Sequence, residues 1–163
     1  IFTRVLKGHI AVASYKLDKK TCGAKIDKEA RKYLNQINLD YAHGTGHGVG
    51  YFLNVHEGPQ SISRNNKTNF QLGMIVSNEP GYYEKDKFGI RIENLIYVKK
   101  YKSKIVFDNL TMVPIDKNLI DQSILSESEK SWLNKYHNKV FKNLRSFMDK
   151  VELSELQKAC SAI

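Results

Sequence analysis

The sequence has little that would place it in a membrane or in an oxidising compartment. No apolar run approaches the ~20 residues that a membrane-spanning helix needs. The first residues, IFTRVLKGHIAVAS, lack the charged start and apolar block of a secretory signal. Only two cysteines occur, Cys22 and Cys160, far apart and without a partner motif. We therefore predict a cytoplasmic location, free thiols and no membrane partner.

Arginine is scarce as well, although the net charge is +9. The basic residues are nearly all lysines scattered along the chain, and they form no basic helix and no repeated pattern with aromatic residues. This patterning argues against a nucleic-acid partner. The 41% of hydrophobic and 26% of charged residues are typical of a globular protein.

Apolar spacing of three and four residues predicts helices at both ends of the sequence. Asp27 is expected to cap the second helix, and Ser126 with Glu129 forms a capping box for the third. The segment after Val151 fits either helix or coil. The predicted helices span residues 2–16, 27–37 and 127–149.

Short β-rich runs dominate the middle of the sequence, from about 48 to 115. MIVSNEP, FGIRIENLIYVKK and KIVF alternate with glycine and proline, and no helix of crossover length separates them. Such spacing favours antiparallel pairing, because parallel strands need long connections. The fold class predicted is therefore α+β, a curved antiparallel sheet with helices on its outer face.

One stretch, HGTGHGVG, concentrates glycine around two histidines. Ordered glycine is costly in conformational entropy, so the stretch is either a tight turn or a place where backbone must approach a ligand. His43, His47 and His56 fall within fourteen residues, and Glu79 and Glu93 follow on β-like segments. Taken alone, Glu79 or Glu93 could be an ordinary acidic residue on the solvent-facing side of a strand. Together, an imidazole and two carboxylates suit Mn²⁺, Co²⁺ or Zn²⁺.

The motifs HGTGHGVG, NVHEGP, NEPGYY and GIRIENL occur in this order. This set resembles the catalytic half of the metal-dependent aminopeptidases of the creatinase or "pita-bread" fold, and it is most similar to the Xaa-Pro aminopeptidases (aminopeptidase P). The resemblance extends over nearly the whole sequence. It implies half or more of a pita-bread fold, with His47 as a metal ligand, Glu79 as a ligand and general base, and Glu93 as a ligand that bridges two ions.

The resemblance also implies roles for residues that do not bind metal. His43 and His56 would contact the substrate and the tetrahedral intermediate, and Arg91 and Tyr83 would lie beside the ligands. The implied activity is removal of an N-terminal residue that precedes proline, by attack of metal-activated water. The implied cofactors are two divalent ions, Mn²⁺ in preference to Zn²⁺ or Co²⁺. His9 and His137 match no catalytic position and are expected to be structural. The alternative is a catalytically inactive module of this fold that binds peptides or proteins.

Two of the five ligands in the resembling family are aspartates on strands that precede the first helix, and none of the aspartates here matches them. We therefore expect residues 1–163 to be the C-terminal portion of a catalytic domain, with 116–163 as a helical extension. It is either a fragment of an enzyme or a chain that stands alone. By itself it should bind Mn²⁺ weakly, hydrolyse peptides negligibly, and form a homodimer or pair with the missing N-terminal half.

Overall fold

The computed structural model describes residues 1–52 and 54–163. They form two compact units, the first made of Ile1 and Thr3–Thr111 and the second of Phe2 and Met112–Ile163. In the part of the chain described, no helix combines the length and the apolar character needed to cross a bilayer.

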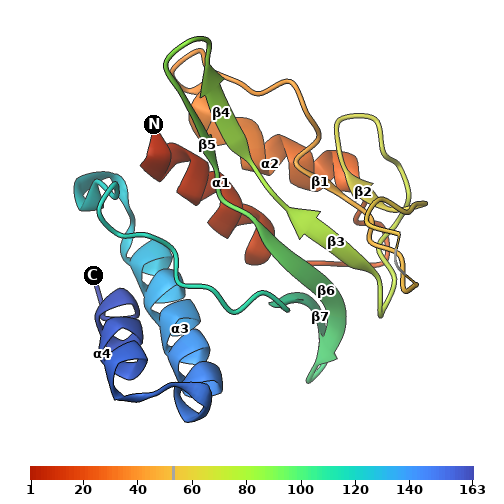
Figure 1. Cartoon of the computed structure of the whole chain (residues 1–163). Helices are drawn as coiled ribbons and strands as arrows, with labels where there is room; N and C mark the ends of the chain where they lie inside the picture. Colours follow the sequence, from red (N-terminus) through yellow and green to blue (C-terminus); the bar gives the residue numbers. More distant parts are fainter. Residues whose placement is uncertain (53) are drawn as a thin grey trace. The chain divides into compact units, whose positions relative to one another are not determined.

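Two helices open the first unit, α1 (Phe2–Ala13) and α2 (Gly23–Asn35) (Figure 1). The second begins earlier than predicted, and the expectation that Asp27 caps it is wrong. Cys22 is the N-cap, and Asp27 lies buried inside the helix. Glycine permits the earlier start, because a Cβ on Gly23 would lie 1.8 Å from the carbonyl oxygen of Ser61.

Seven strands follow, and every pair among the described residues is antiparallel, as predicted. They group as β1–β2, β3–β6–β7 and β4–β5. A bridge between Gly48 and Val76 ties the first group to β3. The strands are β1 (Gly46–His47), β2 (Ser61–Ile62), β3 (Ile75–Asn78), β4 (Gly81–Glu84), β5 (Phe88–Arg91), β6 (Asn94–Tyr101) and β7 (Lys104–Asn109).

The run FGIRIENLIYV is two strands rather than one, because the sheet bends in its middle. β3 pairs with β6 as far as Asn78 opposite Asn94, and the chain then leaves this ladder to form the β4–β5 hairpin. Glu79 and Glu93 are the residues next to Asn78 and Asn94 at this junction. The bend therefore brings the two carboxylates, 14 positions apart in sequence, to one place on the sheet.

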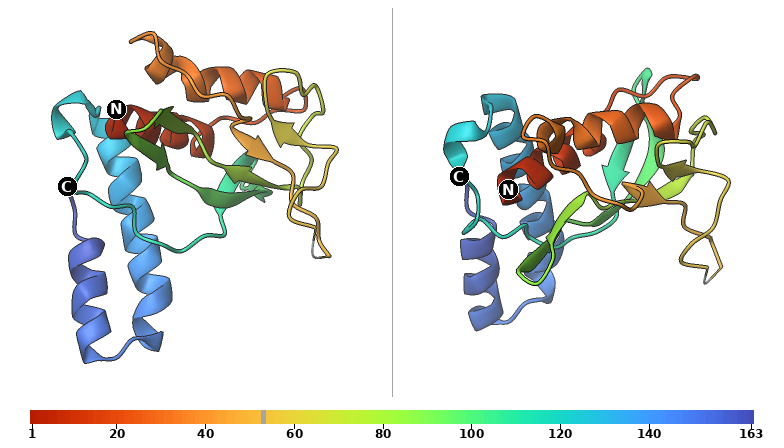
Figure 2. Two further views of the ribbon diagram at one scale, coloured as in Figure 1. Left: turned by 45° about the horizontal axis from the view of Figure 1, so that its top comes forward. Right: turned by 90° about the horizontal axis from the view of Figure 1, so that it is seen from above.

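Both helices of the first unit cover one face of the β3–β6–β7 sheet (Figure 2). Val12 from α1 and Ala30 from α2 belong to the same apolar cluster as alternate residues of the strands. Burial of this cluster fixes which face of each strand points inward. Its members are Val12, Ile26, Ala30, Ile62, Phe70, Val76, Ile96, Val98 and Phe107.

The second unit consists of short and long helices: η1 (Gln122–Ile124), α3 (Glu127–Leu144), η2 (Arg145–Phe147) and α4 (Lys150–Ala159). The capping box of Ser126 and Glu129 is present at the start of α3, as predicted. The predicted helix 127–149 is too long, because Asp149 and Glu152 form a second capping box that starts a new helix. The segment after Val151 is accordingly helical.

Candidate metal centre

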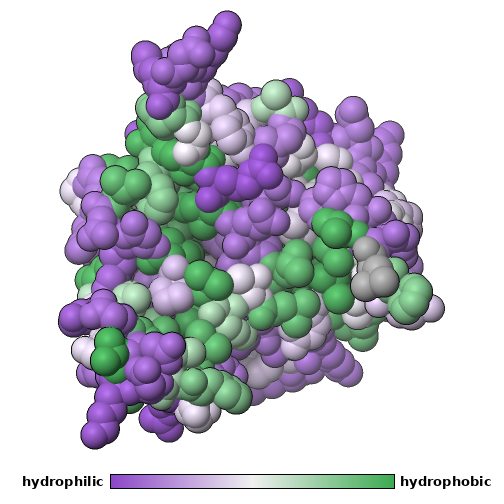
Figure 3. Space-filling model, viewed as in Figure 1, coloured by the Kyte–Doolittle hydropathy of each residue, from purple (hydrophilic) through white to green (hydrophobic). Residues whose placement is uncertain are grey.

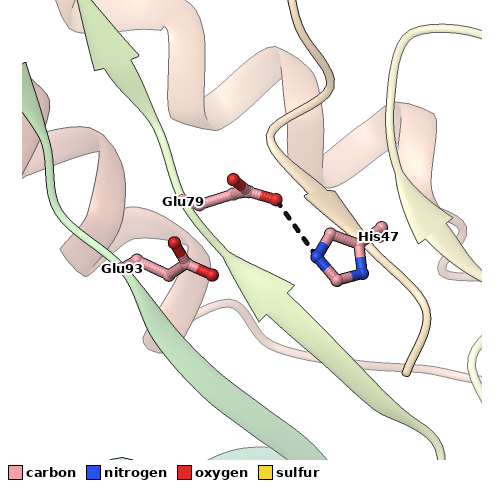
Figure 4. A group of neighbouring side chains, drawn as sticks. All are labelled: His47, Glu79 and Glu93. Atoms are coloured by element: carbon pink, nitrogen blue, oxygen red, sulfur yellow. Dashed lines mark ion pairs between the residues drawn. The ribbon is translucent and has the colours of Figure 1, made fainter. Parts of the chain in front are cut away.

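Three of the residues singled out in the sequence converge at the bend of the sheet (Figure 4). One ligand atom each from His47, Glu79 and Glu93 lies within 4.8 Å of the other two. His47 comes from β1, whereas the two glutamates flank the β4–β5 hairpin. Segments well separated in sequence thus supply one imidazole and two carboxylates to one point.

The ring of His47 is oriented by the backbone. Its Nδ1 lies 3.0 Å from the carbonyl oxygen of Gly48. A carbonyl only accepts hydrogen bonds, so Nδ1 is the donor in this contact and Nε2 is the ring nitrogen turned towards the carboxylates. That Nε2 faces Glu79, with 3.5 Å to Oε1 (Figure 4). Backbone carbonyls hold metal-binding histidines in the same way in known sites.

Ser77, a residue that the sequence did not single out, links the backbone of His47 to the side chain of Glu79. Its hydroxyl accepts a hydrogen bond from the backbone N–H of His47 at 2.8 Å and donates to Glu79 Oε1 at 2.9 Å. Ser77 is fully buried. The one signal in the sequence was a small polar residue inside the apolar run MIVSNEP, which is weak evidence by itself.

The glycines beside His47 are required by close backbone contacts. A Cβ on Gly46 would lie 1.9 Å from the carbonyl oxygen of Ser77, and one on Gly48 would lie 2.0 Å from that of Glu57. Distances this short are incompatible with any side chain. At these two positions glycine is required for close approach of one backbone segment to another: it lets β1 lie against β3 and brings His47 to the carboxylates. The approach of this backbone to a ligand stays a prediction.

The imidazole of His56 lies against that of His47, with ring centroids 3.9 Å apart. His56 is exposed and belongs to the connection between β1 and β2. The same connection exposes the apolar side chains of Tyr51, Phe52 and Val55. In the space-filling view of Figure 3, hydrophobic surface alternates with hydrophilic surface. A solvent-facing imidazole next to the three donors can reach a molecule bound there.

A chain of hydrogen bonds links Glu79 to His43. Arg91 donates from Nη1 to Glu79 Oε2 at 3.0 Å and from Nε to the hydroxyl of Tyr83 at 2.7 Å. That hydroxyl lies 2.9 Å from His43 Nε2. The hydrogen bond to Tyr83 raises the pKa of Arg91, and the charge of Glu79 adds to the effect. All seven predicted site residues therefore lie in one connected group, and their individual roles stay predictions.

The two remaining histidines lie outside this group and are fully buried. His9 Nδ1 bonds the carbonyl oxygen of Ile92, and burial lowers its pKa to about 4. His137 Nε2 accepts the N–H of Ile115. Burial, with the charge of Lys117, lowers the pKa of His137 to about 4. Both rings are neutral and serve packing, as their position in helices suggested.

Two family models match the chain. Metallopeptidase family M24 matches residues 1–100, and the C-terminal region of peptidase M24 matches residues 104–163. Aminopeptidase P2 of Arabidopsis thaliana is 49% identical over 91% of this chain and 22% of its own length. "Probable Xaa-Pro aminopeptidase P" of Laccaria bicolor is 47% identical over 99% of this chain and 27% of its own length. The chain thus spans about a quarter of these relatives.

Solved structures point to the same family as the two matched models. The X-prolyl aminopeptidase of Caenorhabditis elegans, described as a cytosolic enzyme with a di-nuclear active site, superposes with a TM-score of 0.92 at 40% identity, over 99% of this chain and 28% of that protein. Prolidase from Pyrococcus furiosus superposes with a TM-score of 0.60 at 27% identity, over 68% of this chain and 31% of that protein. On the matched models, the identities and this fold, the chain belongs to metallopeptidase family M24.

Proposed function

We propose that this chain is part of the catalytic domain of a Xaa-Pro aminopeptidase, an enzyme that removes an N-terminal residue preceding proline. The observation that carries the proposal is the convergence of His47, Glu79 and Glu93 within 4.8 Å. The names of the relatives in Arabidopsis and Laccaria point to the same activity. The donors present would be completed by ligands from residues outside this chain.

The donor set fits divalent metal ions. His47 presents Nε2 as an imidazole donor, and two carboxylates supply the hard oxygen donors that Mn²⁺ prefers, although Zn²⁺ and Co²⁺ also accept such a mixture. In this proposal two such ions, Mn²⁺ first, would be held by His47, Glu79 and Glu93, with Glu93 as the ligand that both ions would share. When bound, a pair of such ions lowers the pKa of water and polarises the scissile carbonyl.

The chain's own residues would orient the substrate and move the proton. Glu79 accepts hydrogen bonds from Ser77 on one carboxylate oxygen and from Arg91 on the other, so its orientation is fixed before substrate arrives. In this proposal Glu79 takes the proton of the attacking water. His56, exposed beside His47, and His43, held by Tyr83, contact the peptide and its tetrahedral intermediate.

Three further features complete the proposal. The substrate is a peptide with proline at its second position, and no nucleic acid or membrane takes part. The protein acts in the cytoplasm, like the relative described as cytosolic. Residues 116–163 are a helical extension of the catalytic domain, and the chain forms a homodimer or pairs with the N-terminal half of that domain.

Substitution of the proposed ligands tests the function. In the full-length protein that contains this chain, His47→Ala, Glu79→Gln and Glu93→Gln should each lose bound metal, measured by mass spectrometry after dialysis. Hydrolysis of a Xaa-Pro peptide should fall by about 10³-fold or more, since removal of a group that acts directly on the reacting atoms costs on this scale.

Glu29→Gln is the matched control, because it removes a carboxylate from the solvent-exposed side of α2. It should retain both metal and activity. Full activity in Glu79→Gln or His47→Ala would contradict the proposal. A wild-type protein that binds metal and peptide without cleaving the peptide would instead be the inactive binding module.

A further inference from the structure

We propose that the buried pair of Asp27 and Arg31 on α2 is the positioning device for His43. The inference rests on the proposed function, in which His43 contacts substrate. Asp27 and Arg31 are 1% and 5% exposed. They touch none of the three converging donors in any described hydrogen bond or ion pair, so their role has to be exerted through the segment 40–45, which connects α2 to β1.

Arg31 holds two backbone carbonyls of this segment with one planar group. Its Nη1 donates to the carbonyl oxygen of Tyr41 and its Nη2 to that of His43, each at 2.7 Å. The guanidinium carbon also lies 4.0 Å from the centre of the Tyr41 ring. A guanidinium presents its donors in a fixed fork, so contacts with both carbonyls fix the direction in which the chain enters His43.

Asp27 fixes Arg31 and reaches further along the same segment. Its Oδ2 accepts from Arg31 Nε at 2.8 Å, and its Oδ1 accepts from the Thr45 hydroxyl at 2.7 Å. The backbone carbonyl of Thr45 in turn accepts the N–H of Glu79 at 2.8 Å. The Asp27–Arg31 pair of α2 therefore holds segment 40–45 on both sides of His43, and the hydrogen bond of Thr45 fixes this segment next to Glu79.

The position of the His43 ring depends on this anchorage. Its Nδ1 bonds the neighbouring carbonyl oxygen of Gly44, and its Nε2 bonds the Tyr83 hydroxyl. The ring also lies 4.9 Å from that of Tyr41, which Arg31 covers. A shift of the Tyr41 and His43 carbonyls would therefore move the imidazole relative to Tyr83. A displacement near 1 Å at a reacting centre costs about 10²-fold in rate.

The outer end of the network balances the charge of Arg31. Asp40 accepts from Arg31 Nη1 at 2.7 Å and also pairs with Arg64 at the surface. Partial burial would raise the pKa of Asp40, but its hydrogen bonds, first that from Arg31, outweigh this and lower it. Burial disfavours the charged form of Arg31, yet its carboxylate partners raise its pKa. Arg31 and Asp40 therefore favour their charged forms and are hydrogen-bonded to each other, the condition under which buried charges are tolerated.

A double-mutant cycle in the full-length, metal-loaded protein tests the inference. Arg31→Lys keeps the charge near Asp27 but loses the fork. It should lower kcat about 10- to 100-fold, with a smaller change in KM and unchanged bound metal. In a His43→Ala background the same substitution should add less than about 3-fold, because its effect passes through His43. If the fold-losses in kcat of Arg31→Lys and His43→Ala multiply in the double mutant, the inference is overturned.

A second measurement does not depend on activity. With ¹⁵N-labelled imidazoles in the metal-free protein, Arg31→Lys should shift the ring signals of His43 and leave those of His137, a buried histidine of the second unit, in place. Arg4→Lys is the matched control, because Arg4 also donates to a carbonyl of α2, that of Tyr33, outside the segment 40–45. It should move neither signal.

The two readouts separate failure of the inference from failure of the proposed function. A wild-type protein without peptidase activity would defeat the function, and the His43 signals would still decide whether Arg31 positions the ring. Unshifted His43 signals in folded Arg31→Lys would defeat the inference. If Arg31→Lys does not fold, Thr45→Val takes its place, because it removes the hydroxyl that bonds both Asp27 and the Tyr41 hydroxyl and so releases the same segment; the same criteria then apply.

Discussion

The helices of the two units are fixed by different kinds of contact. The helices α3 and α4 of the second unit each begin with a capping box made by residues three positions apart, Ser126 with Glu129 and Asp149 with Glu152. The helices α1 and α2 of the first unit have no side-chain cap. They are fixed by distant residues instead. Asn78 donates to the carbonyl oxygen of His9, 69 positions away, at 3.0 Å.

This difference explains where the site can be built. Local caps define the ends of a helix but bring no distant residues together. The contacts between distant residues in the first unit bring β1, the β4–β5 hairpin and α2 to one point, and all predicted site residues belong to that unit. Substitutions that disrupt contacts between distant residues in the first unit should therefore affect both stability and the site, whereas those in the second should affect stability alone.

The largest effect is expected from Gly46→Ala. The added methyl would lie 1.9 Å from the backbone oxygen of Ser77, so β1 must move away from β3 and take His47 with it. We expect a loss of stability of about 3 kcal/mol, at the upper end for overpacking, and metal affinity lower by at least about 100-fold. Chemical unfolding and metal titration measure the two effects.

Gly44→Ala is the comparison for this change. The nearest atoms to a Cβ there lie at 3.4 Å, an ordinary contact. Stability should change by less than about 1 kcal/mol, within the range of substitutions without a clash. Equal losses for Gly44→Ala and Gly46→Ala would show that the close approach of β1 to β3 is not what the glycine provides.

A second, smaller effect is a loss of stability when the pH is lowered, caused by protonation of His9. His9 has a pKa of about 4 in the folded protein against 6.5 in a model peptide, so the unfolded chain binds the proton more readily. Above pH 6.5 the titration of His9 therefore leaves the free energy of unfolding unchanged. As the pH drops from 6.5 towards 4, protonation of His9 in the unfolded chain lowers that free energy. Between pH 7 and pH 5 the loss is about 2 kcal/mol.

His9→Asn sharpens this prediction, because an amide can donate to the carbonyl of Ile92 as Nδ1 does but does not titrate. Urea unfolding at pH 7 and pH 5 should show a smaller acid-induced loss in the variant than in the wild type. His137→Gln should act in the same direction in the second unit, with an amide oxygen to accept the N–H of Ile115. An unchanged difference between the two pH values in His9→Asn would contradict the argument.

The smallest effect is expected from Ser126→Ala at the start of α3. Loss of the capping side chain should cost about 1 kcal/mol. A slightly lower melting temperature with unchanged peptidase activity is the expected result, and Ser131→Ala, at an exposed position within α3, is the control. Lower peptidase activity at a temperature where the Ser126→Ala protein is still folded would contradict the proposed difference between the two units.

The same contrast determines what the sequence alone could predict. The start of α3 follows from Ser126 and Glu129, which are close in sequence. The antiparallel pairing followed from strand spacing, and the candidate site from the clustered histidines and carboxylates and from the ordered motifs that carry the family resemblance. The start of α2 was missed because it depends on the contact of Gly23 with Ser61, and Asp27 was misplaced as a cap for that reason. Ser77 and the Arg31 fork were not found, since their roles depend on contacts with residues distant in sequence: Ser77 bonds His47, 30 positions away, and Arg31 bonds the carbonyl of His43, 12 positions away.

The spacing of the three donors has a consequence for folding. His47, Glu79 and Glu93 meet only when the sheet bends, so an unfolded chain has no comparable site. An ion that binds these donors therefore binds the native form and shifts the folding equilibrium by mass action. At a free concentration 100 times the dissociation constant this linkage amounts to about 2.7 kcal/mol. Metal supply would then govern how much of the protein survives proteolysis.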